Sequence, residues 1–214
     1  RPFTMVAEER LLATSDGVER VIADDVPGDL IECGVWRGGS TLAIVLTLLA
    51  HGVTDRDVWL YDTFEGMTEP TALDTSRFDG EAVDAWERST QVGERIFGDT
   101  FASHSFGVDQ VRRLLASSGY PDERLHFVQG PVEDTIPAHA PSQISFMRLD
   151  TDWYESTKHE LDHLYPRLGS GGVLVIDDYG HWDGARRAVD EYFTSVPRPF
   201  LTRSDYSGRI GCKP

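Results

Sequence analysis

Residues 29–40 read DLIECGVWRGGS, and this stretch decides the fold of the chain. It begins with a short apolar run, Asp29–Cys33, which is typical of a buried strand. Several glycines follow, and an apolar segment of helix length, Ser40–Leu49, comes next. A glycine-rich turn between a strand and a helix lets a ligand approach the backbone and directs free helix N–H groups at an anion. The stretch therefore predicts an α/β protein that binds a small molecule at this turn.

Similar apolar runs recur along the chain and alternate with amphipathic segments of helix length. Further strands are expected at Val58–Tyr61, Leu125–Val128, Ile144–Leu149 and Val173–Ile176. Further helices are expected at Val108–Ser117, Tyr154–Arg167 and Gly184–Phe193, and two short extended segments close the chain. Apolar residues crowd these strands on both faces, as in a parallel sheet that is covered by crossover helices. The pattern predicts one α/β domain over residues 1–214, with a mostly parallel sheet and helices on both faces.

Residues 66–103 break this alternation. They are polar, rich in glycine and without a clean periodicity. A connection this long is usually functional or disordered. Because Trp86, Ile96, Phe97 and Phe101 give it apolar side chains with which to pack, we interpret it as an inserted lid.

Composition excludes several classes of protein. Acidic residues outnumber basic ones by 36 to 20, which gives a formal net charge of −16. A field of that sign repels nucleic acid and anionic lipid. The longest apolar stretch, Leu42–Ala50, is far shorter than the roughly 20 residues of a membrane span. Cys33 and Cys212 cannot form a disulfide framework, and no signal peptide opens the sequence, so we expect a cytoplasmic protein.

The glycine turn and the tip of the next strand together indicate the ligand. Trp36 stands where the dinucleotide fingerprint needs its middle glycine, which disfavours a pyrophosphate and hence a nicotinamide dehydrogenase. The carboxylate of an amino acid suits the turn better. Asp62 ends the second strand, where an acid accepts hydrogen bonds from ribose hydroxyls. Two structural alternatives to ligand binding remain. In one, the glycines serve only to shape the turn, and in the other, Asp62 serves only as a helix cap or turn residue. Turn and acid together favour S-adenosylmethionine.

Carboxylate pairs follow two later strands. Ile144–Leu149 leads into Asp150 and Asp152, and Val173–Ile176 leads into Asp177 and Asp178. If the two strands are neighbours, these acids converge, which costs free energy unless some are protonated or a cation binds. Oxygen ligands favour a hard ion, Mg²⁺ first, with Mn²⁺ or Ca²⁺ possible. In the alternative interpretation, Asp150 and Asp177 cap the helices that follow.

The histidines carry a weaker signal. His159 and His163 lie one helical turn apart without a third ligand, which is typical of a polar helix face. His181 follows the second acidic pair closely, and we expect it near the acceptor.

The sequence resembles the macrocin O-methyltransferase family, which methylates sugar hydroxyls of bacterial natural products. The resemblance rests on Arg1–Met5, Ile31–Ser40, Tyr61–Gly66, Arg148–Trp153 and Val175–Tyr179. It implies a class I methyltransferase fold, Rossmann-like, with a seven-stranded sheet and a C-terminal antiparallel hairpin. It also implies a homodimer or higher homo-oligomer, a divalent ion near the acceptor, and a glycosylated small molecule as acceptor.

Matched position by position, the resemblance also implies roles for individual residues. Glu32 would hold the amino end of the methionine moiety, and Asp62 the ribose. Asp152 would act as general base beside the metal ligands Asp150, Asp177 and Asp178. The implied cofactor-binding residues are Thr4, Met5, Glu32, Gly34, Val35, Trp36, Gly38, Gly39, Ser40, Asp62, Thr63, Val132, Glu133 and Asp150.

Two alternatives remain open from the sequence. A catechol or phenol O-methyltransferase uses the same metal on a more acidic hydroxyl and needs a base such as Asp152 less. A non-catalytic subunit that binds a nucleoside or a metal is the alternative outside enzymes, although such a protein needs no base beside its metal.

Overall fold

The computed structural model describes residues 3–92 and 107–214 and contains a central seven-stranded sheet with the strand order β5-β2-β1-β6-β7-β9-β8. Strands β5, β2, β1, β6 and β7 are parallel, whereas β9 runs antiparallel to β7 and β8. The strands are β1 (Asp29–Cys33), β2 (Val58–Asp62), β5 (Leu125–Gln129), β6 (Ile144–Leu149), β7 (Leu168–Ile176), β8 (Thr202–Arg203) and β9 (Arg209–Cys212). The predicted parallel sheet and the closing antiparallel hairpin are confirmed.

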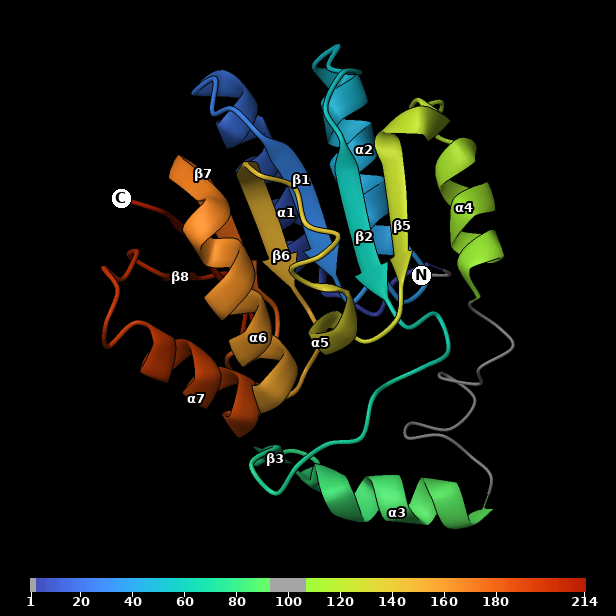
Figure 1. Cartoon of the computed structure of the whole chain (residues 1–214), viewed down its shortest axis with the longest axis vertical. Helices are drawn as coiled ribbons and strands as arrows, with labels where there is room; N and C mark the ends of the chain where they lie inside the picture. The colour runs from blue at the N-terminus through green and yellow to red at the C-terminus, as the bar shows by residue number, and fades with distance from the viewer. Residues whose placement is uncertain (1–2, 93–106) are drawn as a thin grey trace.

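Helices cover both faces of this sheet (Figure 1). One face carries α1 (Glu8–Ala23), α2 (Gly39–Ala50) and α4 (Val108–Ala116), and the other carries α5 (Val132–Thr135), α6 (Tyr154–Leu164) and α7 (Asp183–Tyr192). Successive strand side chains point to opposite faces. Leu30 therefore joins the core under α1, α2 and α4, whereas Ile31 joins the core under α6 and α7. Burial on both faces explains the unbroken apolar runs of the strands.

Several boundaries differ from the predicted ones for local reasons. Helix α6 ends at Leu164, and residues 165–167 form a short 3-10 turn that contains Pro166. Strand β7 begins at Leu168, five residues before the predicted start at Val173. The prediction began too late because it followed apolar residues, and Gly169, Gly171 and Gly172 interrupt them in the first half of the strand. Helix α1 was not predicted at all, since its core contacts come from single positions such as Val18 and Val21 within a largely polar segment.

The described part of the 66–103 insertion is more ordered than its sequence indicates. It contains a small hairpin, β3 (Thr75–Ser76) with β4 (Gly80–Glu81), followed by α3 (Ala82–Val92). Asp74 is fully buried, and its carboxylate accepts a hydrogen bond of 2.7 Å from the backbone N–H of Tyr154 at the start of α6. Ile96, Phe97 and Phe101, which suggested that the insertion packs, lie outside the described residues. That the insertion acts as a lid stays a prediction.

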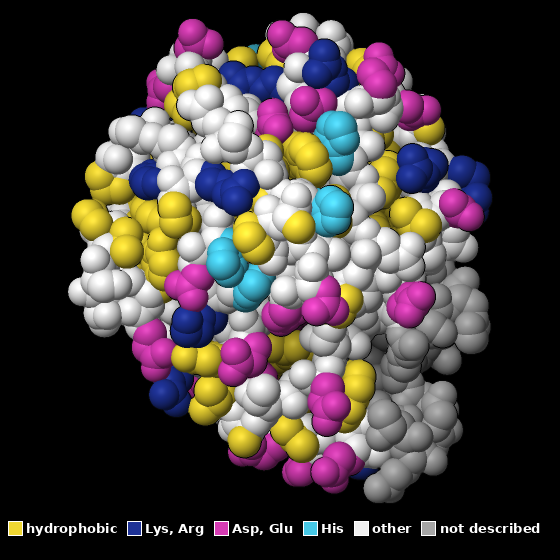
Figure 2. All heavy atoms as spheres, viewed as in Figure 1, with side chains coloured by type: hydrophobic (Ala, Val, Ile, Leu, Met, Phe, Trp, Pro, Cys, Tyr) yellow, Lys and Arg dark blue, Asp and Glu magenta, His cyan; other side chains and the backbone are white. Residues whose placement is uncertain are grey.

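The carboxyl ends of the parallel strands lie along one edge of the sheet, and the insertion with α3 lies beyond that edge (Figure 1). Residues that follow these strands are therefore brought together between the sheet and the insertion. Among the helices of residues 3–92 and 107–214, none is long and apolar enough to cross a membrane. Figure 2 shows Asp and Glu side chains scattered over one face of the molecule, with Lys and Arg side chains between them.

Candidate active site

A cavity of about 540 Å³ opens at this edge of the sheet, within the range of small-molecule sites. Its lining comes from segments that are far apart in the sequence. The turns after β1, β2 and β5 contribute Gly34, Trp36, Asp62, Thr63, Val132 and Glu133. The insertion and the loops near α7 and β9 contribute Met67, Thr68, Asp79, His181, Trp182, Tyr206 and Ser207. Asp150, Asp152, Asp177 and Asp178 also line the cavity.

Asp62 braces the glycine turn. One of its carboxylate oxygens accepts hydrogen bonds from the backbone N–H groups of Val35 (2.7 Å) and Trp36 (2.9 Å). The other accepts one from the N–H of Phe64 (2.6 Å). Burial raises the pKa of Asp62, and the hydrogen bonds from these backbone groups oppose that rise. The acid at the tip of β2 therefore fixes the shape of the turn as well as facing the cavity.

Two glycines of the turn are required by close contacts. Gly34 has a positive φ of 82°, and a Cβ atom there would lie 1.9 Å from the carbonyl oxygen of Asp150. A Cβ atom on Gly39 would lie 2.4 Å from the carbonyl oxygen of Phe3. The turn is thus pressed against the end of β6 on one side and against the N-terminal segment on the other. Met5, in that segment, also lines the cavity.

Three carboxylates converge where β6 and β7 end. These strands are neighbours, with Leu149 opposite Ile176, so the acids that follow them meet. Asp150, Asp177 and Asp178 each offer one oxygen, and these atoms lie within 4.8 Å of one another. The predicted convergence is confirmed for three of the four acids, Asp152 being the one outside the group. The helix-cap alternative is wrong, because neither α6 nor α7 has a side-chain cap, and Asp74 binds the first N–H of α6.

Asp152 stands beside this cluster. Its backbone N–H donates to a carboxylate oxygen of Asp178 (3.3 Å), and its own carboxylate accepts a hydrogen bond from the indole N–H of Trp182 (2.9 Å). Asp152 has a positive φ of 69°, which is uncommon for a residue with a side chain. Burial, and next the charge of Asp150, raise the pKa of Asp152 to about 8. Two hydrogen bonds thus hold Asp152 in place at the edge of the cluster.

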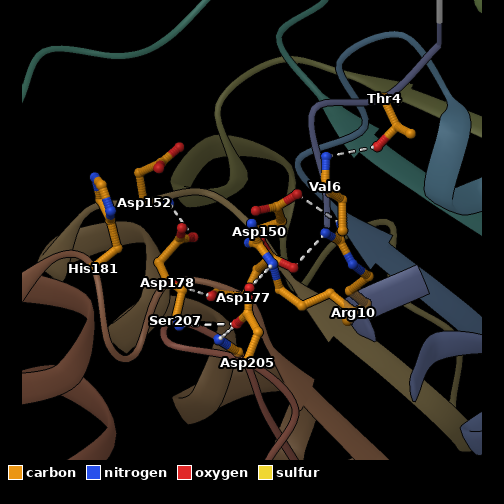
Figure 3. A network of polar contacts seen from close by, with 12 residues as sticks. Thr4, Val6, Arg10, Asp150, Asp152, Asp177, Asp178, His181, Asp205 and Ser207 are labelled. Carbon is orange, nitrogen blue, oxygen red and sulfur yellow. Dashed lines mark hydrogen bonds and ion pairs between the residues drawn. The ribbon is translucent and has the colours of Figure 1, made fainter. Parts of the chain in front are cut away.

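Two arginines reach the same cluster, and Figure 3 shows one of them, Arg10, beside Asp150 and Asp177. Arg148 is 1% exposed and contacts Glu32 (2.7 Å), Asp150 (2.7 Å) and Asp177 (2.6 Å). Arg10, on α1, contacts Asp177 and lies 3.0 Å from Asp205. Burial lowers the pKa of Arg148, but the surrounding carboxylates outweigh burial and raise it well above its ordinary value.

Acidic side chains nevertheless outnumber these arginines in the cluster, which leaves a negative excess in a buried place. Burial is also the main cause that raises the pKa of Asp150 and of Asp178 well above the ordinary value. Such a cluster is stabilised either by bound protons or by a cation. Carboxylate oxygens at this spacing fit a hard divalent ion.

The predicted site residues fall into two groups. Those that line the cavity are Met5, Gly34, Trp36, Asp62, Thr63, Val132, Glu133, Asp150, Asp152, Asp177, Asp178 and His181. Those outside the lining are Thr4, Glu32, Val35, Gly38, Gly39 and Ser40. Glu32 is 1% exposed, and its two oxygens accept hydrogen bonds from Arg148 and Thr41. The structure therefore gives Glu32 partners within the protein, and its contact with a cofactor stays a prediction.

Sequence reasoning missed several residues of the site. They are Arg10, Met67, Asp79, Arg148, Trp182 and Tyr206. Arg148 carried a signal that could have revealed it, because a charged residue within the apolar run Ile144–Leu149 needs buried partners. Arg10 and Tyr206 carried none, since long-range packing of α1 and of the closing hairpin brings them to the cavity.

Comparisons with known proteins identify the family of the chain. The model of a family described as macrocin-O-methyltransferase (TylF) matches residues 1–199. Over 189 residues, 88% of the chain, it is 41% identical to an 8-demethyl-8-(2,3-dimethoxy-α-L-rhamnosyl)-tetracenomycin-C 4′-O-methyltransferase of Streptomyces olivaceus and covers 67% of that protein. It is 35% identical, again over 88% of its length, to a demethyldecarbamoylnovobiocin O-methyltransferase of Streptomyces niveus, of which it covers 67%. The chain thus spans about two thirds of the length of these relatives.

Solved structures show the same fold. The structure of the O-methyltransferase NovP superposes with a TM-score of 0.81 at 32% identity, covering 99% of this chain and 82% of that one. The calicheamicin methyltransferase CalS11 superposes with a TM-score of 0.73 at 20% identity, covering 94% of this chain and 77% of that one. The predicted class I methyltransferase fold is confirmed.

Proposed function

Because the chain belongs to the macrocin-O-methyltransferase family, we propose that it moves the methyl group of S-adenosylmethionine to a sugar hydroxyl of a glycosylated small molecule. That the chain is an O-methyltransferase follows from its relatives. The sugar acceptor is an extension from their names, which describe a rhamnosyl tetracenomycin, a novobiocin precursor and mycinamicin III. We expect the protein to act as a homodimer or a higher homo-oligomer.

One observation carries the proposal. The carboxylate cluster of Asp150, Asp177 and Asp178 lies in the same cavity as the braced glycine turn, and the fourth carboxylate of Asp152 lies beside it. A ligand at the turn and a hydroxyl at the cluster therefore meet within one cavity. Neither a nucleoside-binding subunit nor a metal sensor needs this arrangement.

The fit to a divalent ion rests on the donor set. Asp150, Asp177 and Asp178 would hold Mg²⁺, with Mn²⁺ and Ca²⁺ as alternatives, because their oxygens converge and the cluster keeps a negative excess. A bound divalent ion would stabilise negative charge on an acceptor oxygen. The two arginines contact the two oxygens of Asp177, Arg148 at Oδ1 and Arg10 at Oδ2, so the orientation of this carboxylate is fixed.

The chain's own residues would do the remaining work. The glycine turn, with Asp62, Trp36 and Glu133 around it, would hold the cofactor so that its methyl group faces the cluster. Asp152 would take the proton of the acceptor hydroxyl, and the indole of Trp182 keeps its carboxylate turned toward that place. In-line placement of the acceptor oxygen, the methyl carbon and the sulfur would supply the rest of the rate.

The proposal is tested by calorimetry and by methyl transfer. We expect the protein to bind S-adenosylhomocysteine and not NAD. It should transfer a labelled methyl group from S-adenosylmethionine to a rhamnosylated polyketide, and EDTA should abolish this transfer until Mg²⁺ is restored. Full activity after exhaustive chelation would contradict the metal assignment. If the protein methylates catechol and transfers no methyl group to any glycoside, the acceptor is a phenol and not a sugar.

A further inference from the structure

One wall of the cavity is formed by three polar side chains from three separate segments. They are Asp79 in the insertion, His181 after β7, and Tyr206 in the closing hairpin, and we call them the histidine wall. All three line the cavity, together with Met67 and Trp182. Figure 3 shows His181 across the acidic cluster from Thr4 and Val6, in the N-terminal segment. Nothing in the methyl-transfer chemistry described above uses them.

The histidine wall is a continuous chain of hydrogen bonds. The Nε2 atom of His181 lies 2.8 Å from a carboxylate oxygen of Asp79, and its Nδ1 atom lies 3.0 Å from the hydroxyl of Tyr206. Both ring nitrogens therefore have partners, and the imidazole is fixed in orientation. A carboxylate accepts at two oxygens, and a phenol hydroxyl both donates and accepts. Asp79 and Tyr206 thus keep hydrogen-bonding capacity for a ligand.

Aromatic packing fixes the wall from behind. The ring of Phe78 stacks on His181 at 5.4 Å with an interplanar angle of 13°, and it meets Tyr206 edge-on at 5.3 Å. On the other side, the ring of Trp182 lies 5.1 Å from that of His181. The side chain of Phe78 is 52% exposed although it contacts two rings. Phe78 is therefore not a core residue, and its contacts serve to position His181 and Tyr206.

The wall stands next to the candidate base. Figure 3 shows His181 beside Asp152 and Asp178. Trp182, the neighbour of His181, donates the hydrogen bond that holds Asp152. The backbone N–H of His181 also donates to the carbonyl oxygen of Asp178 (3.0 Å). A hydroxyl that meets Asp152 therefore belongs to a molecule whose neighbouring atoms face the wall.

We propose that the histidine wall recognises the ring hydroxyls next to the one that is methylated. Asp79 and Tyr206 would contact these hydroxyls, and His181 is the positioning residue that holds both of them in place. This inference rests on the proposed function. A pyranose presents several hydroxyls around a ring with an apolar C–H face. The wall matches this pattern, because it offers several polar groups set among the rings of Trp182, His181 and Tyr206. A catechol has no hydroxyl beyond those at the reacting edge and would leave the wall without polar partners.

The test uses methyl α-L-rhamnopyranoside as the probe, with protein loaded with S-adenosylhomocysteine and Mg²⁺. Its Kd is measured by saturation-transfer NMR, alongside that of its monodeoxy analogues. His181→Phe keeps the ring stacked on Phe78 but releases Asp79 and Tyr206 from their hydrogen bonds to the ring. We expect Kd to rise about tenfold, the effect of losing one to two hydrogen bonds from these two residues to the sugar. Tyr206→Phe should raise it about twofold to fivefold. His139→Phe, at an exposed histidine outside the cavity, is the matched control and should change nothing.

The monodeoxy probes separate recognition from mere support. Wild-type protein should bind at least one monodeoxy analogue more weakly than the parent, and His181→Phe should lose that preference. An unchanged preference in His181→Phe, or wild-type protein that binds no rhamnoside, would overturn the inference. Calorimetry of S-adenosylhomocysteine decides which proposal has failed. If the cofactor still binds and the wall variants have no effect, only the role of the histidine wall is contradicted. If the wild-type protein does not bind the cofactor, the proposed function itself is contradicted.

Discussion

The two sides of the cavity are built in different ways. The side around the glycine turn comes from segments that directly follow β1, β2 and β5, and its main contacts are backbone hydrogen bonds to Asp62. The histidine wall comes from the insertion, the loop before α7 and the closing hairpin, and its contacts join side chains. Asp150 and Asp152 stand between the two.

This difference indicates how one scaffold serves several acceptors. A turn that is fixed by its own backbone and by close glycine contacts tolerates little change, because a side chain on Gly34 or Gly39 would collide with backbone atoms. The histidine wall consists of side chains on loops, so a single substitution can change the groups that it presents to an acceptor. We therefore expect relatives that methylate different acceptors to share the first side and to differ in the second.

The largest effect is expected at the junction of the two sides. Asp152→Asn keeps an oxygen that accepts the hydrogen bond of Trp182, so the site should keep its shape. Because the proposed base is lost, kcat should fall by roughly 10²–10⁴-fold. Steady-state kinetics would measure the fall, and calorimetry should find the affinities for S-adenosylhomocysteine and Mg²⁺ nearly unchanged. Raising the pH should restore part of the activity, since more of the acceptor hydroxyl ionises without help.

Asp150→Asn is the matched comparison for this prediction. It should weaken metal binding and lower activity together, because Asp150 belongs to the converging cluster. If Asp152→Asn abolishes metal binding while Asp150→Asn spares it, the two roles are reversed.

The fold was largely predictable because its signals are local. The sheet strands β1, β2, β5 and β6 were expected nearly where they lie, since each contains an apolar run, which is buried on both faces in β1 and β6 and half-buried in the edge strand β5. Helix α3 was not predicted, because its few apolar residues lie in the polar, glycine-rich segment that was interpreted as an irregular insertion. Helix α1 was missed because only a narrow stripe of it is buried.

The candidate site was predictable mainly on one side, and on the other side only His181 was expected. The glycine turn, Asp62 and the acidic pairs occupy fixed positions at strand ends, so their sequence neighbours place them. Asp79 reaches the cavity because the insertion contacts the start of α6, and Tyr206 reaches it because β9 pairs with β7. These are long-range contacts, which no local sequence pattern predicts. Glu32 shows what a position alone does not reveal, because its carboxylate contacts the buried Arg148, and its contact with the cofactor stays a prediction.

A smaller effect is expected on the turn side. Asp62→Ala removes the brace of the turn and, in our proposal, the partner of the ribose, so the affinity for S-adenosylhomocysteine should fall by about 1.5–3 kcal/mol. Calorimetry with this ligand and with its 2′,3′-dideoxy analogue would separate the two roles. Wild-type protein should prefer the ligand with the intact ribose, and the variant should not.

Rhamnoside binding at the histidine wall is the internal control, because its Kd should not change in Asp62→Ala. A variant that still prefers the intact ribose as strongly as the wild type would show that Asp62 only braces the turn.

The smallest effect concerns Glu160, which supports the junction from α6. This side chain is fully buried, and one of its oxygens accepts a hydrogen bond from the hydroxyl of Thr151 (2.9 Å), between Asp150 and Asp152. Burial raises the pKa of Glu160 to about 8 from its ordinary value of 4.5. Between these two values the folded protein keeps the proton while the unfolded chain releases it, so rising pH favours unfolding.

Glu160→Gln should remove this contribution. The free energy of unfolding of the wild type should fall, relative to that of the variant, by about 1 kcal/mol for each pH unit between pH 5.5 and 7.5, because one proton is linked to folding over that window. Urea unfolding at pH 5.5, 6.5 and 7.5 measures the difference. Glu155→Gln, at an exposed position on the same helix, should run parallel to the wild type at all three values. Since glutamine still accepts a hydrogen bond from Thr151, the affinities for S-adenosylhomocysteine and for the rhamnoside should both persist. A difference between Glu160→Gln and the wild type that does not grow with pH would mean that Glu160 is ionised in the folded protein, and the junction would then hold a buried charge that neither side of the cavity balances.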